Sequence, residues 1–445
     1  MKSIALSIVC ASGVVLVACA LGKGGEAAVS QVPKKPLMKD FIGMNTHTVQ
    51  MKSELYKPVT SLLRNYHPVE WDLQEDPSNV AEFPWARNRV NWNELYGKWA
   101  KDGYDVNASV MFESIKLDKW KNIPKDAYEY GRSFARYFGP SGNIKSVKAI
   151  EIGNEPTDWD DAKYRQMFEA MAKGIREGDP KMLISTCAVA IGKEDKYSKD
   201  IAGLKGLEKY IDILNVHVYS FVEHWPTWKR SFPEDPKIVY LKQVQGIIDW
   251  KNKNSPHSKV WITEFGYDST TKPNLPTGDF AKWVGVTDTQ QAQWLVRSFL
   301  VFASMDVDRA YMYWFNDEDK PTLHASSGLT RNYQPKPSFH AQAHLFKSLS
   351  NYRFEKALVQ KPGEGYAYQF AASSGNDKIV VAWSPTGANR AGNLSIPLKG
   401  FTVSKAEKMP LKEGAPEASK ATIDASGNLT CPIDGSPTYI WLQPR

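Results

Sequence analysis

Cysteine and histidine are scarce in this 445-residue sequence, which contains 4 and 8 of them. Two of the four cysteines lie within the first 19 residues, and the other two, Cys187 and Cys431, fall in regions that we expect to belong to different domains. The sequence therefore does not indicate a disulfide framework, and no cysteine pair has the spacing of a zinc site. We expect no metal and no cofactor.

The sequence also lacks a glycine-rich phosphate-binding turn and a cluster of basic residues. The net charge of +7 is spread along the chain, which indicates a solvated surface and no nucleic-acid partner. Hydrophobic residues make up 42% and charged residues 24%, as in ordinary globular proteins. Aromatic residues are plentiful, with 15 tryptophans, which suits either a large aromatic core or a protein that stacks the flat faces of sugar rings.

An apolar run from Ile4 to Ala18 follows Lys2 and is short for a membrane-spanning helix. This pattern predicts a signal peptide over residues 1–18. Leu16-Val17-Ala18-Cys19 resembles a bacterial lipoprotein box, so we expect a lipid anchor at Cys19 to be the sole membrane contact of an exported protein. Cleavage after a later alanine, giving a periplasmic or secreted protein, is the alternative. Residues 19–37 are predicted to be a flexible tether.

Residues 38–350 alternate short apolar runs with amphipathic stretches. Stretches 160–178 and 287–305 place apolar residues on one helical face, as do similar segments between the other runs. The eight apolar runs are predicted strands: 41–47, 61–66, 106–112, 147–155, 182–189, 211–219, 259–265 and 309–315. Eight such units predict an α/β fold, a (β/α)8 TIM barrel enlarged by loop insertions. An open doubly wound sheet is the alternative, but it would more often carry the glycine-rich turn that is missing.

Residues 351–445 lose the helical period. Residues 366–370 alternate with period two, and further short runs are separated by Gly, Pro, Asn and Ser. This pattern predicts a small C-terminal antiparallel β-sandwich domain. We expect it to support the barrel, with carbohydrate binding as an alternative role.

Two predicted strands end in a glutamate. Ala149-Ile150-Glu151-Ile152 runs into Gly153-Asn154-Glu155-Pro156, and Val260-Trp261-Ile262-Thr263 runs into Glu264. Hydrolysis of a glycosidic bond with retention of configuration requires two carboxyl groups about 5 Å apart. In a barrel, such groups come from the carboxyl ends of different strands. A single glutamate at a strand end is usually a surface group or a helix cap, but two on the fourth and seventh strands indicate a catalytic pair.

Asn154-Glu155-Pro156 and Thr263-Glu264-Phe265-Gly266 are similar to the signatures of clan A glycoside hydrolases. The likeness covers the barrel, and one barrel with one C-terminal β-sandwich resembles glycoside hydrolase family 39 and its relatives. The resemblance implies a retaining hydrolase that cleaves β-glycosidic bonds in a polysaccharide or oligosaccharide. It makes Glu155 the acid/base and Glu264 the nucleophile, and it implies that Asn154 binds the 2-hydroxyl of the sugar.

Other strand ends are consistent with this resemblance. Clan members place a tyrosine at the end of strand six, here Tyr219, whose hydroxyl touches the nucleophile. Arg64 ends strand two, and a cation near Glu264 would lower the pKa of that carboxyl. Trp314 ends strand eight and is expected to form the platform beneath the sugar. His217 precedes Tyr219 by two residues and is expected to contact substrate.

Asn45 and His47 end strand one and are expected to bind sugar hydroxyls. Arg64 as a purely structural ion-pair partner and His217 as a core histidine are the plainer alternatives. Glu113, after strand three, is interpreted as a surface residue rather than a substrate contact. Seven tryptophans lie in predicted loops at the active face, where we expect some to pack and a few to stack sugars: Trp71, Trp85, Trp120, Trp159, Trp225, Trp228 and Trp283.

Two other functions fit the same fold. A metal-dependent barrel hydrolase usually has a His-x-His pair on the first strand, where this chain has Asn45 and His47. A non-catalytic sugar-binding surface protein would not need both glutamates. We expect a monomer whose partner is a glycan. The sugar, its linkage and endo or exo action remain open at this stage.

Overall fold

The computed structural model describes residues 35–48, 52–192 and 196–445. The predicted signal peptide, Cys19 and most of the predicted tether lie outside the described residues. In the described part of the chain, no helix is both long and apolar enough to cross a membrane. Cys187 and Cys431 are buried and free.

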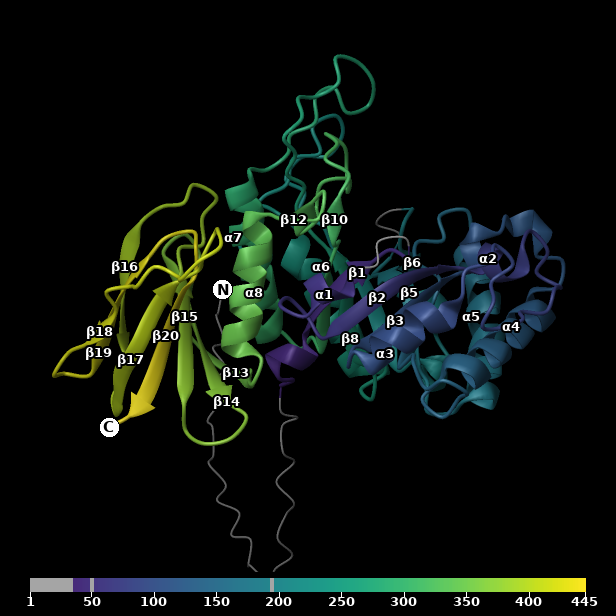
Figure 1. The fold of residues 1–445 in the computed structure, drawn as a ribbon, viewed down its shortest axis with the longest axis horizontal. Helices are drawn as coiled ribbons and strands as arrows, with labels where there is room; N and C mark the ends of the chain where they lie inside the picture. The colour runs from purple at the N-terminus through teal and green to yellow at the C-terminus, as the bar shows by residue number, and fades with distance from the viewer. Residues whose placement is uncertain (1–34, 49–51, 193–195) are drawn as a thin grey trace, which may run out of the picture. The chain divides into compact units, whose positions relative to one another are not determined.

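Eight parallel strands among the described residues close into a barrel in the order β1-β2-β3-β4-β5-β7-β8-β9 (Figure 1). The ring is completed by the pairing of β9 with β1. The barrel strands are β1 (Ile42–Thr46), β2 (Leu62–Pro68), β3 (Asp105–Met111), β4 (Ala149–Ile152), β5 (Leu183–Ala190), β7 (Ile213–His217), β8 (Lys259–Phe265) and β9 (Arg309–Met312). The predicted fold class, a TIM barrel followed by a β-sandwich, is confirmed.

Helices follow the strands and bury their apolar faces against them. The helices are α1 (Ser53–Tyr56), α2 (Val69–Leu73), α3 (Lys98–Lys101), α4 (Ile123–Phe138), α5 (Asp161–Gly178), α6 (Tyr240–Asn254), α7 (Asp288–Ser304) and α8 (Pro337–Leu349). Asp160 caps α5 by accepting from the Lys163 N–H, and Thr287 and Gln290 form a capping box at the start of α7. Helices 160–178 and 287–305 are thus confirmed within one residue at each end.

Shorter elements lie mainly in the connections. They are the 3-10 turns η1 (Met38–Asp40), η3 (Phe112–Ser114), η4 (Leu117–Lys119), η5 (Ile201–Leu204) and η6 (Glu208–Tyr210), the π-helical turn η2 (Asn93–Gly97), and the two-residue strands β6 (Lys199–Asp200), β10 (Asn316–Asp317), β11 (Thr330–Arg331) and β12 (Gln334–Pro335). Teal and green loops project beyond β10 and β12 in Figure 1.

The barrel interior changes from apolar to polar along the strands. Inward side chains near the amino ends form a separate buried apolar cluster: Leu62, Ala149, Ile213, Trp261 and Tyr311. Gly43 makes space for the Tyr311 ring, since a Cβ there would lie 2.3 Å from it. The residues two positions further along four of these strands are polar and buried: Arg64, Glu151, Asn215 and Thr263. A packed floor therefore supports a polar layer at the carboxyl ends of the strands.

An irregularity in β8 decides where Glu264 lies. His217 of β7 pairs with Glu264, although the residue before His217 pairs with Ile262, so Thr263 is an extra residue. Strict alternation along β8 would turn Thr263 inward and Glu264 outward. The bulge instead brings both side chains into the barrel, where Glu264 contacts Arg64.

Two antiparallel sheets form the C-terminal domain. The five-stranded sheet has the order β13-β14-β15-β20-β17, and the three-stranded sheet has the order β16-β19-β18. Their strands are β13 (Tyr352–Lys361), β14 (Gly365–Ala372), β15 (Lys378–Trp383), β16 (Gly392–Pro397), β17 (Phe401–Lys408), β18 (Thr422–Ile423), β19 (Asn428–Ile433) and β20 (Thr438–Pro444). One face of the larger sheet packs on the smaller sheet, while Tyr368, Phe370 and Trp383 on the other face join the main core. Figure 1 shows α8 between this sheet and the barrel strands.

A buried ion pair connects the barrel to this domain. Arg297 of α7 donates to both carboxylate oxygens of Glu234, from Nε at 2.9 Å. Trp383 Nε1, at the end of β15, donates to the same carboxylate at 2.6 Å, and Arg297 Nη1 donates to the Thr386 carbonyl at 2.9 Å. The side chains of Arg297 and Glu234 are both 0% exposed, so water cannot replace either partner.

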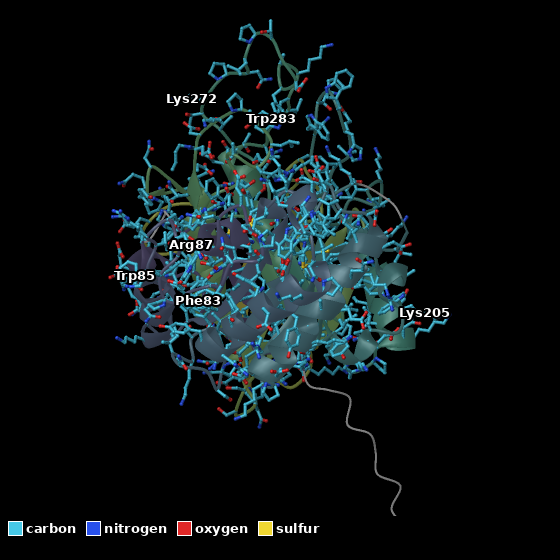
Figure 2. All side chains as sticks on the ribbon, turned by 90° about the vertical axis from the view of Figure 1, so that its right-hand side faces the viewer. Phe83, Trp85, Arg87, Lys205, Lys272 and Trp283 are labelled. Carbon is cyan, nitrogen blue, oxygen red and sulfur yellow. The ribbon has the colours of Figure 1, made fainter. Side chains whose placement is uncertain are left out.

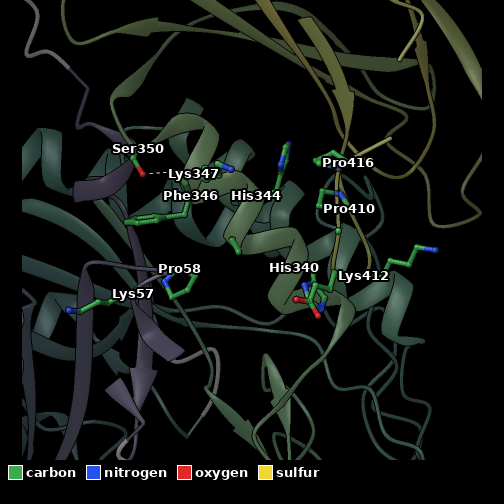
Figure 3. Close-up of a pocket in the computed structure, with 13 residues that line it drawn as sticks. Lys57, Pro58, His340, His344, Phe346, Lys347, Ser350, Pro410, Lys412 and Pro416 are labelled. Carbon is green, nitrogen blue, oxygen red and sulfur yellow. Dashed lines mark hydrogen bonds between the residues drawn. The ribbon is translucent and has the colours of Figure 1, made fainter. Parts of the chain in front are cut away.

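A cavity of about 530 Å³ lies between α8 and the loop around Pro410 (Figure 3). His340 and His344 line it, but the Lys57 and Lys412 side chains point away from it in Figure 3. It contains none of the residues predicted to act on substrate.

We expect Glu234→Ala to lower the free energy of unfolding by about 3–5 kcal/mol, because Arg297 would be left buried without its partner. Glu364 forms an exposed ion pair with Lys361, so Glu364→Ala is the matched control and should change stability by less than about 0.5 kcal/mol. Urea unfolding followed by tryptophan fluorescence measures both variants. Equal losses for the two would contradict a stabilising role of the buried pair.

Candidate active site

Glu155 and Glu264 meet at the carboxyl ends of the barrel strands. One oxygen of each carboxyl and one ring nitrogen of His217 all lie within 4.8 Å of one another. Glu264 lies in β8, and Glu155 lies in the turn after β4 with 26% of its side chain exposed. A separation near 5 Å suits a carboxylate that attacks an anomeric carbon beside an acid that protonates the leaving oxygen.

Four side chains surround the Glu264 carboxylate. Arg64 Nη1 lies 3.0 Å from Oε1, the Tyr66 hydroxyl donates to Oε1 at 2.6 Å, and the Tyr219 hydroxyl donates to Oε2 at 2.9 Å. His217 Nδ1 lies 3.6 Å from Oε2. Burial alone would raise the pKa of Glu264, but His217, Arg64 and the Tyr66 hydrogen bond outweigh it and hold the pKa at about 2. Glu264 is therefore ionised at neutral pH.

The pKa of Glu155 is shifted in the opposite direction. Burial raises its pKa above the ordinary value, although the hydrogen bond and charge of His217 oppose the rise. His217 Nδ1 lies 2.7 Å from Glu155 Oε1, and His217 Nε2 lies 3.0 Å from Thr263 Oγ1. Burial lowers the pKa of His217, but the Glu264 and Glu155 carboxylates outweigh it and raise the pKa. His217 is thus no ordinary core histidine, because it contacts both carboxyls.

Arg64 is the centre of a buried network beneath the pair. Its guanidinium donates to Glu151 from Nε at 2.9 Å, and from Nη1 and Nη2 to Asn45 and Asn154 Oδ1, each at 2.8 Å. Burial lowers the pKa of Arg64, but Glu151 and Glu264 raise it well above its ordinary value. Since Asn154 uses Oδ1 for Arg64, its Nδ2 hydrogens remain to donate to a substrate hydroxyl.

Asn45 is placed differently from our expectation. It is 0% exposed, its Oδ1 accepts from Arg64, and its Nδ2 donates to the carbonyls of Thr263 and Met312 at 2.8 and 3.2 Å. With both ends of the amide used and no access to the cleft, Asn45 holds Arg64 in place. The expectation that it binds sugar hydroxyls is corrected.

His47 and Trp314 lie together beside Tyr66. The His47 ring stacks on Tyr66 at 4.9 Å and meets the edge of Trp314 at 4.4 Å between ring centroids. Burial lowers the pKa of His47 to about 4, so its ring is neutral at neutral pH. Trp314 stacks on Tyr313 at 5.6 Å and is 4% exposed. These rings form one aromatic wall next to the Glu264 carboxylate.

Glu113, interpreted from sequence as a surface residue, instead lies half-buried beside the turn that carries Glu155. Its Oε1 accepts the backbone N–H groups of Asn154 and Glu155 at 2.6 and 3.1 Å. Burial raises the pKa of Glu113 to about 7. Gly153, with φ of +85°, precedes this turn, and a Cβ there would lie 2.6 Å from the Phe112 ring. Glu113 therefore fixes the backbone that presents Glu155.

A second group behind Tyr219 was not predicted from sequence. Arg230 lies 4.7 Å over the Tyr219 ring and forms a buried ion pair with Asp268 at 2.9 Å. His324 lies 3.3 Å from Arg230 Nη2 and packs against Tyr219 at 4.4 Å. Burial lowers the pKa of His324 to about 4. These residues lie in loops, where strand periodicity gives no signal, and they fix the tyrosine that orients Glu264.

Glu155, His217 and Glu264 are also the one group of ligand-type side chains in the described residues that is close enough to hold a metal ion. Arg64 lies 3.0 Å from Glu264, however, so one carboxylate already has a cationic partner. The surroundings therefore favour a proton-transfer pair over a metal centre.

No protein-family profile matches this chain. Its structure resembles that of a family 39 glycoside hydrolase from the gut symbiont Bacteroides cellulosilyticus WH2, with a TM-score of 0.67 and 17% identity over 93% of this chain and 83% of that one. A family 30 subfamily 8 xylanase from Clostridium acetobutylicum gives 0.57 and 13%, over 92% and 97%. A family 44 xyloglucanase from Paenibacillus polymyxa gives 0.58 and 11%, over 92% and 97%. The chain has the fold of the clan A glycoside hydrolases.

Among curated proteins, a 228-residue stretch is 21% identical to the human VPS10 domain-containing receptor SorCS1 and covers 47% of this chain. The match spans 18% of that receptor, less than a fifth of its length. The predicted resemblance to clan A glycoside hydrolases is confirmed at the level of the fold.

We expect His217→Asn to raise the pKa of both carboxyls. The variant removes the hydrogen bond and the charge that oppose the raised pKa of Glu155, and it removes the largest charge effect that lowers the pKa of Glu264. Carbon-13 NMR titration of the glutamate carboxyls measures both. His340→Asn, in the cavity of Figure 3, is the control and should leave both titrations unchanged. An unchanged or lower Glu155 pKa in His217→Asn would contradict the assignment.

Proposed function

We propose that this protein is a retaining glycoside hydrolase that cleaves β-glycosidic bonds in a polysaccharide or oligosaccharide. One observation carries the proposal: two carboxyls at the mouth of the barrel lie within 4.8 Å, and their pKa values are shifted in opposite directions. Environments that separate the pKa values of two neighbouring carboxyls are typical of an acid and a nucleophile. Glu155 is the acid/base and Glu264 the nucleophile.

In the first step, a Glu264 oxygen attacks the anomeric carbon while Glu155 gives its proton to the glycosidic oxygen. The bond between the anomeric carbon and the glycosidic oxygen breaks, the aglycone leaves as an alcohol, and a covalent glycosyl ester forms on Glu264. Arg64, Tyr66 and Tyr219 orient the carboxylate before attack. The Nδ2 of Asn154 is placed to donate to the 2-hydroxyl of the sugar, a contact that strengthens in the transition state.

In the second step, Glu155 is a carboxylate and takes a proton from water. The water oxygen attacks the anomeric carbon, the bond to Glu264 breaks, and Glu155 regains its proton. Two displacements at the same carbon restore the original configuration. Trp314 and His47 line the wall against which the sugar ring packs.

The glycan is proposed to be a β-linked xylan or glucan. The structurally similar proteins include xylanases, a glucosidase, a xyloglucanase and an endoglucanase, as their descriptions state. The first panel to test therefore contains soluble xylan, xyloglucan, mixed-linkage β-glucan, and the aryl β-xyloside and β-glucoside. The protein is further proposed to act as an exported monomer with a lipid anchor at Cys19.

We expect Glu264→Gln to reduce hydrolysis by several orders of magnitude, because the amide cannot form the glycosyl ester. The unfolding midpoint should stay close to that of the wild type. Glu364→Gln, on an exposed glutamate of the C-terminal domain, is the control. Product formation from each substrate of the panel measures the activity of both variants. Near-normal turnover by Glu264→Gln would contradict the assignment of Glu264 as the nucleophile. Glycan binding without any product, even by the wild type, would favour the non-catalytic alternative. Loss of wild-type activity on chelation would favour the metal-dependent one.

Chemical rescue of a Glu155 variant distinguishes the acid/base role from the nucleophile role. Glu155→Ala should lose about 10²–10⁴-fold on substrates with poor leaving groups. It should still form the glycosyl ester from an activated aryl glycoside, whose leaving group needs little protonation. Azide should then accelerate turnover and give a β-glycosyl azide, identified by NMR. Rescue of a Glu264 variant with the retained β-azide, or of Glu155→Ala with the inverted α-azide, would exchange the two roles.

The lipid anchor is tested separately in bacteria. We expect the wild type to incorporate labelled palmitate and to fractionate with membranes, because the lipoprotein box places Cys19 at the new amino end. Cys19→Ser should take up no label and should appear in the soluble fraction. Cys187→Ser is the control. Membrane association of Cys19→Ser equal to that of the wild type would contradict the proposal.

A further inference from the structure

The seven loop tryptophans differ in how far their side chains are exposed to solvent. Trp120, Trp159 and Trp283 are at most 5% exposed, and Trp71 and Trp228 are half-buried. Trp85 and Trp225 are 54% and 67% exposed. Leaving most of an indole in water forgoes the free energy of burying it. The exposed rings are therefore the two whose position is not explained by packing within the chain.

Trp225 sits at the tip of a hairpin that starts at the candidate active site. Tyr219, which donates to Glu264, begins the hairpin, and Phe221 pairs with Arg230 across it. The Ser231 N–H donates to the Ser220 carbonyl at 2.8 Å, and the Val222 N–H donates to the Lys229 carbonyl at 2.9 Å. Backbone pairing therefore continues from the catalytic tyrosine almost to the tip.

The tip itself is held in one conformation. The N–H groups of Thr227 and Trp228 both donate to the His224 carbonyl, at 3.0 and 2.9 Å. Trp228 packs against Phe221 at 5.9 Å, so its ring faces the stem of the hairpin. The Trp225 ring is consequently presented to solvent by a turn whose backbone is fixed on both sides, and it loses little further entropy on binding.

A second long loop supports the hairpin. The Val284 N–H donates to the Thr227 carbonyl at 2.8 Å, and Asn274 Nδ2 donates to the Trp283 carbonyl at 2.7 Å. Figure 2 shows Lys272 and Trp283 of this loop in the projecting part of the molecule, while Trp85 lies lower, beside Phe83 and Arg87. The two exposed tryptophans thus belong to different parts of the surface.

Few other large apolar residues of the hairpin and its supporting loop are exposed. Val222, Leu275 and Val284 are 36%, 56% and 40% exposed. Charged groups lie beside Trp225, because Glu223 pairs with Lys229 at 3.5 Å within the same turn. A stable protein interface needs several hundred square ångströms per partner, with a larger apolar centre. A single flat ring on a polar turn instead suits the apolar face of one sugar unit.

The distance between this ring and the catalytic pair is limited by the chain. Trp225 follows Tyr219 by six residues, so the two lie at most about 20 Å apart. That span corresponds to a few sugar units. We propose that Trp225 is a remote platform, on which one ring of a glycan chain stacks while a bond several units away lies at Glu155 and Glu264.

This inference rests on the proposed function and specifies its substrate as a chain long enough to reach both places. It favours cleavage within a polymer over removal of terminal sugars. A substrate with one sugar at the catalytic pair has no second sugar ring to stack on the platform, whereas a polymer gains the stacking contact in addition to the catalytic contacts. The platform is therefore expected to act mainly on KM for polymers.

The test compares Trp225→Ala, Trp225→Phe and the control Trp85→Ala on soluble xylan, xyloglucan and the matching aryl β-glycosides. Trp225→Ala should lower kcat/KM for the preferred polymer, relative to its value for the aryl glycoside, by roughly threefold to tenfold. Trp225→Phe should restore part of this ratio, and Trp85→Ala should leave it within about twofold. Equal effects of Trp225→Ala and Trp85→Ala, or none for either, would overturn the platform.

A second measurement keeps the inference independent of turnover. In the Glu264→Gln background, xylan or xyloglucan in a native gel should retard the protein, and adding Trp225→Ala should weaken the retardation. If the wild type hydrolyses nothing yet this retardation depends on Trp225, the hydrolase proposal fails while the platform stands. If hydrolysis is normal and retardation ignores Trp225, the platform fails alone. A shift from dimer to monomer in Trp225→Ala, seen by light scattering, would assign the ring to a contact between copies and overturn the glycan proposal.

Discussion

The buried guanidinium of Arg64 is the interaction on which the rest of the candidate site depends. It is 0% exposed and lies between two carboxylates, Glu151 and Glu264. Removing a charge from water without a partner costs several kcal/mol, so neither the cation nor the anions would be tolerated here alone. In the proposed mechanism, Glu264 would lose its charge while it carries a glycosyl group. Glu151 would take no part in that chemistry and would keep Arg64 paired throughout the reaction.

The same electrostatics govern the proton on Glu155. The negative charge of Glu264 is one cause of the raised Glu155 pKa. In the proposed mechanism, formation of the glycosyl ester would remove that charge, so the pKa of Glu155 should fall when the residue changes from acid to base. His217 contacts both carboxyls and has a raised pKa, because the two carboxylates favour its protonated ring. Glu113 fixes the backbone of the turn that carries Glu155.

The sequence predicted much of this arrangement because the strands follow a simple period. Inward residues two apart explain why Arg64 and His217 point toward the glutamates, and the same rule points to Tyr66, which we did not single out. The rule fails for Glu264, since strict alternation would send it outward, and only a bulge that no local signal announces brings it inside. Asn45 shows a further limit of prediction from strand periodicity. An inward position does not reveal whether a side chain reaches the cleft or forms all its hydrogen bonds with neighbouring residues. Residues on loops, such as Arg230, Asp268, His324 and Glu113, have no period, and their contacts are set by tertiary packing alone.

The segment from Tyr219 to Val239 connects the candidate active site, the hairpin that carries Trp225, and the C-terminal domain. It begins at the tyrosine that orients Glu264, carries Trp225 at its tip, and then supplies Glu234 to the ion pair with Arg297 and Trp383. Holding a connection of this length in one conformation costs conformational entropy. Contacts at more than one point are needed to offset this cost. Arg230 fixes it next to Tyr219, and Glu234 fixes it against the C-terminal sheet. The β-sandwich lies far from Glu155 along the chain, yet through Glu234 it stabilises the loop that begins at Tyr219, which donates to Glu264. This gives a physical reason for a barrel of this kind to retain a domain that supplies none of the residues around Glu155 and Glu264.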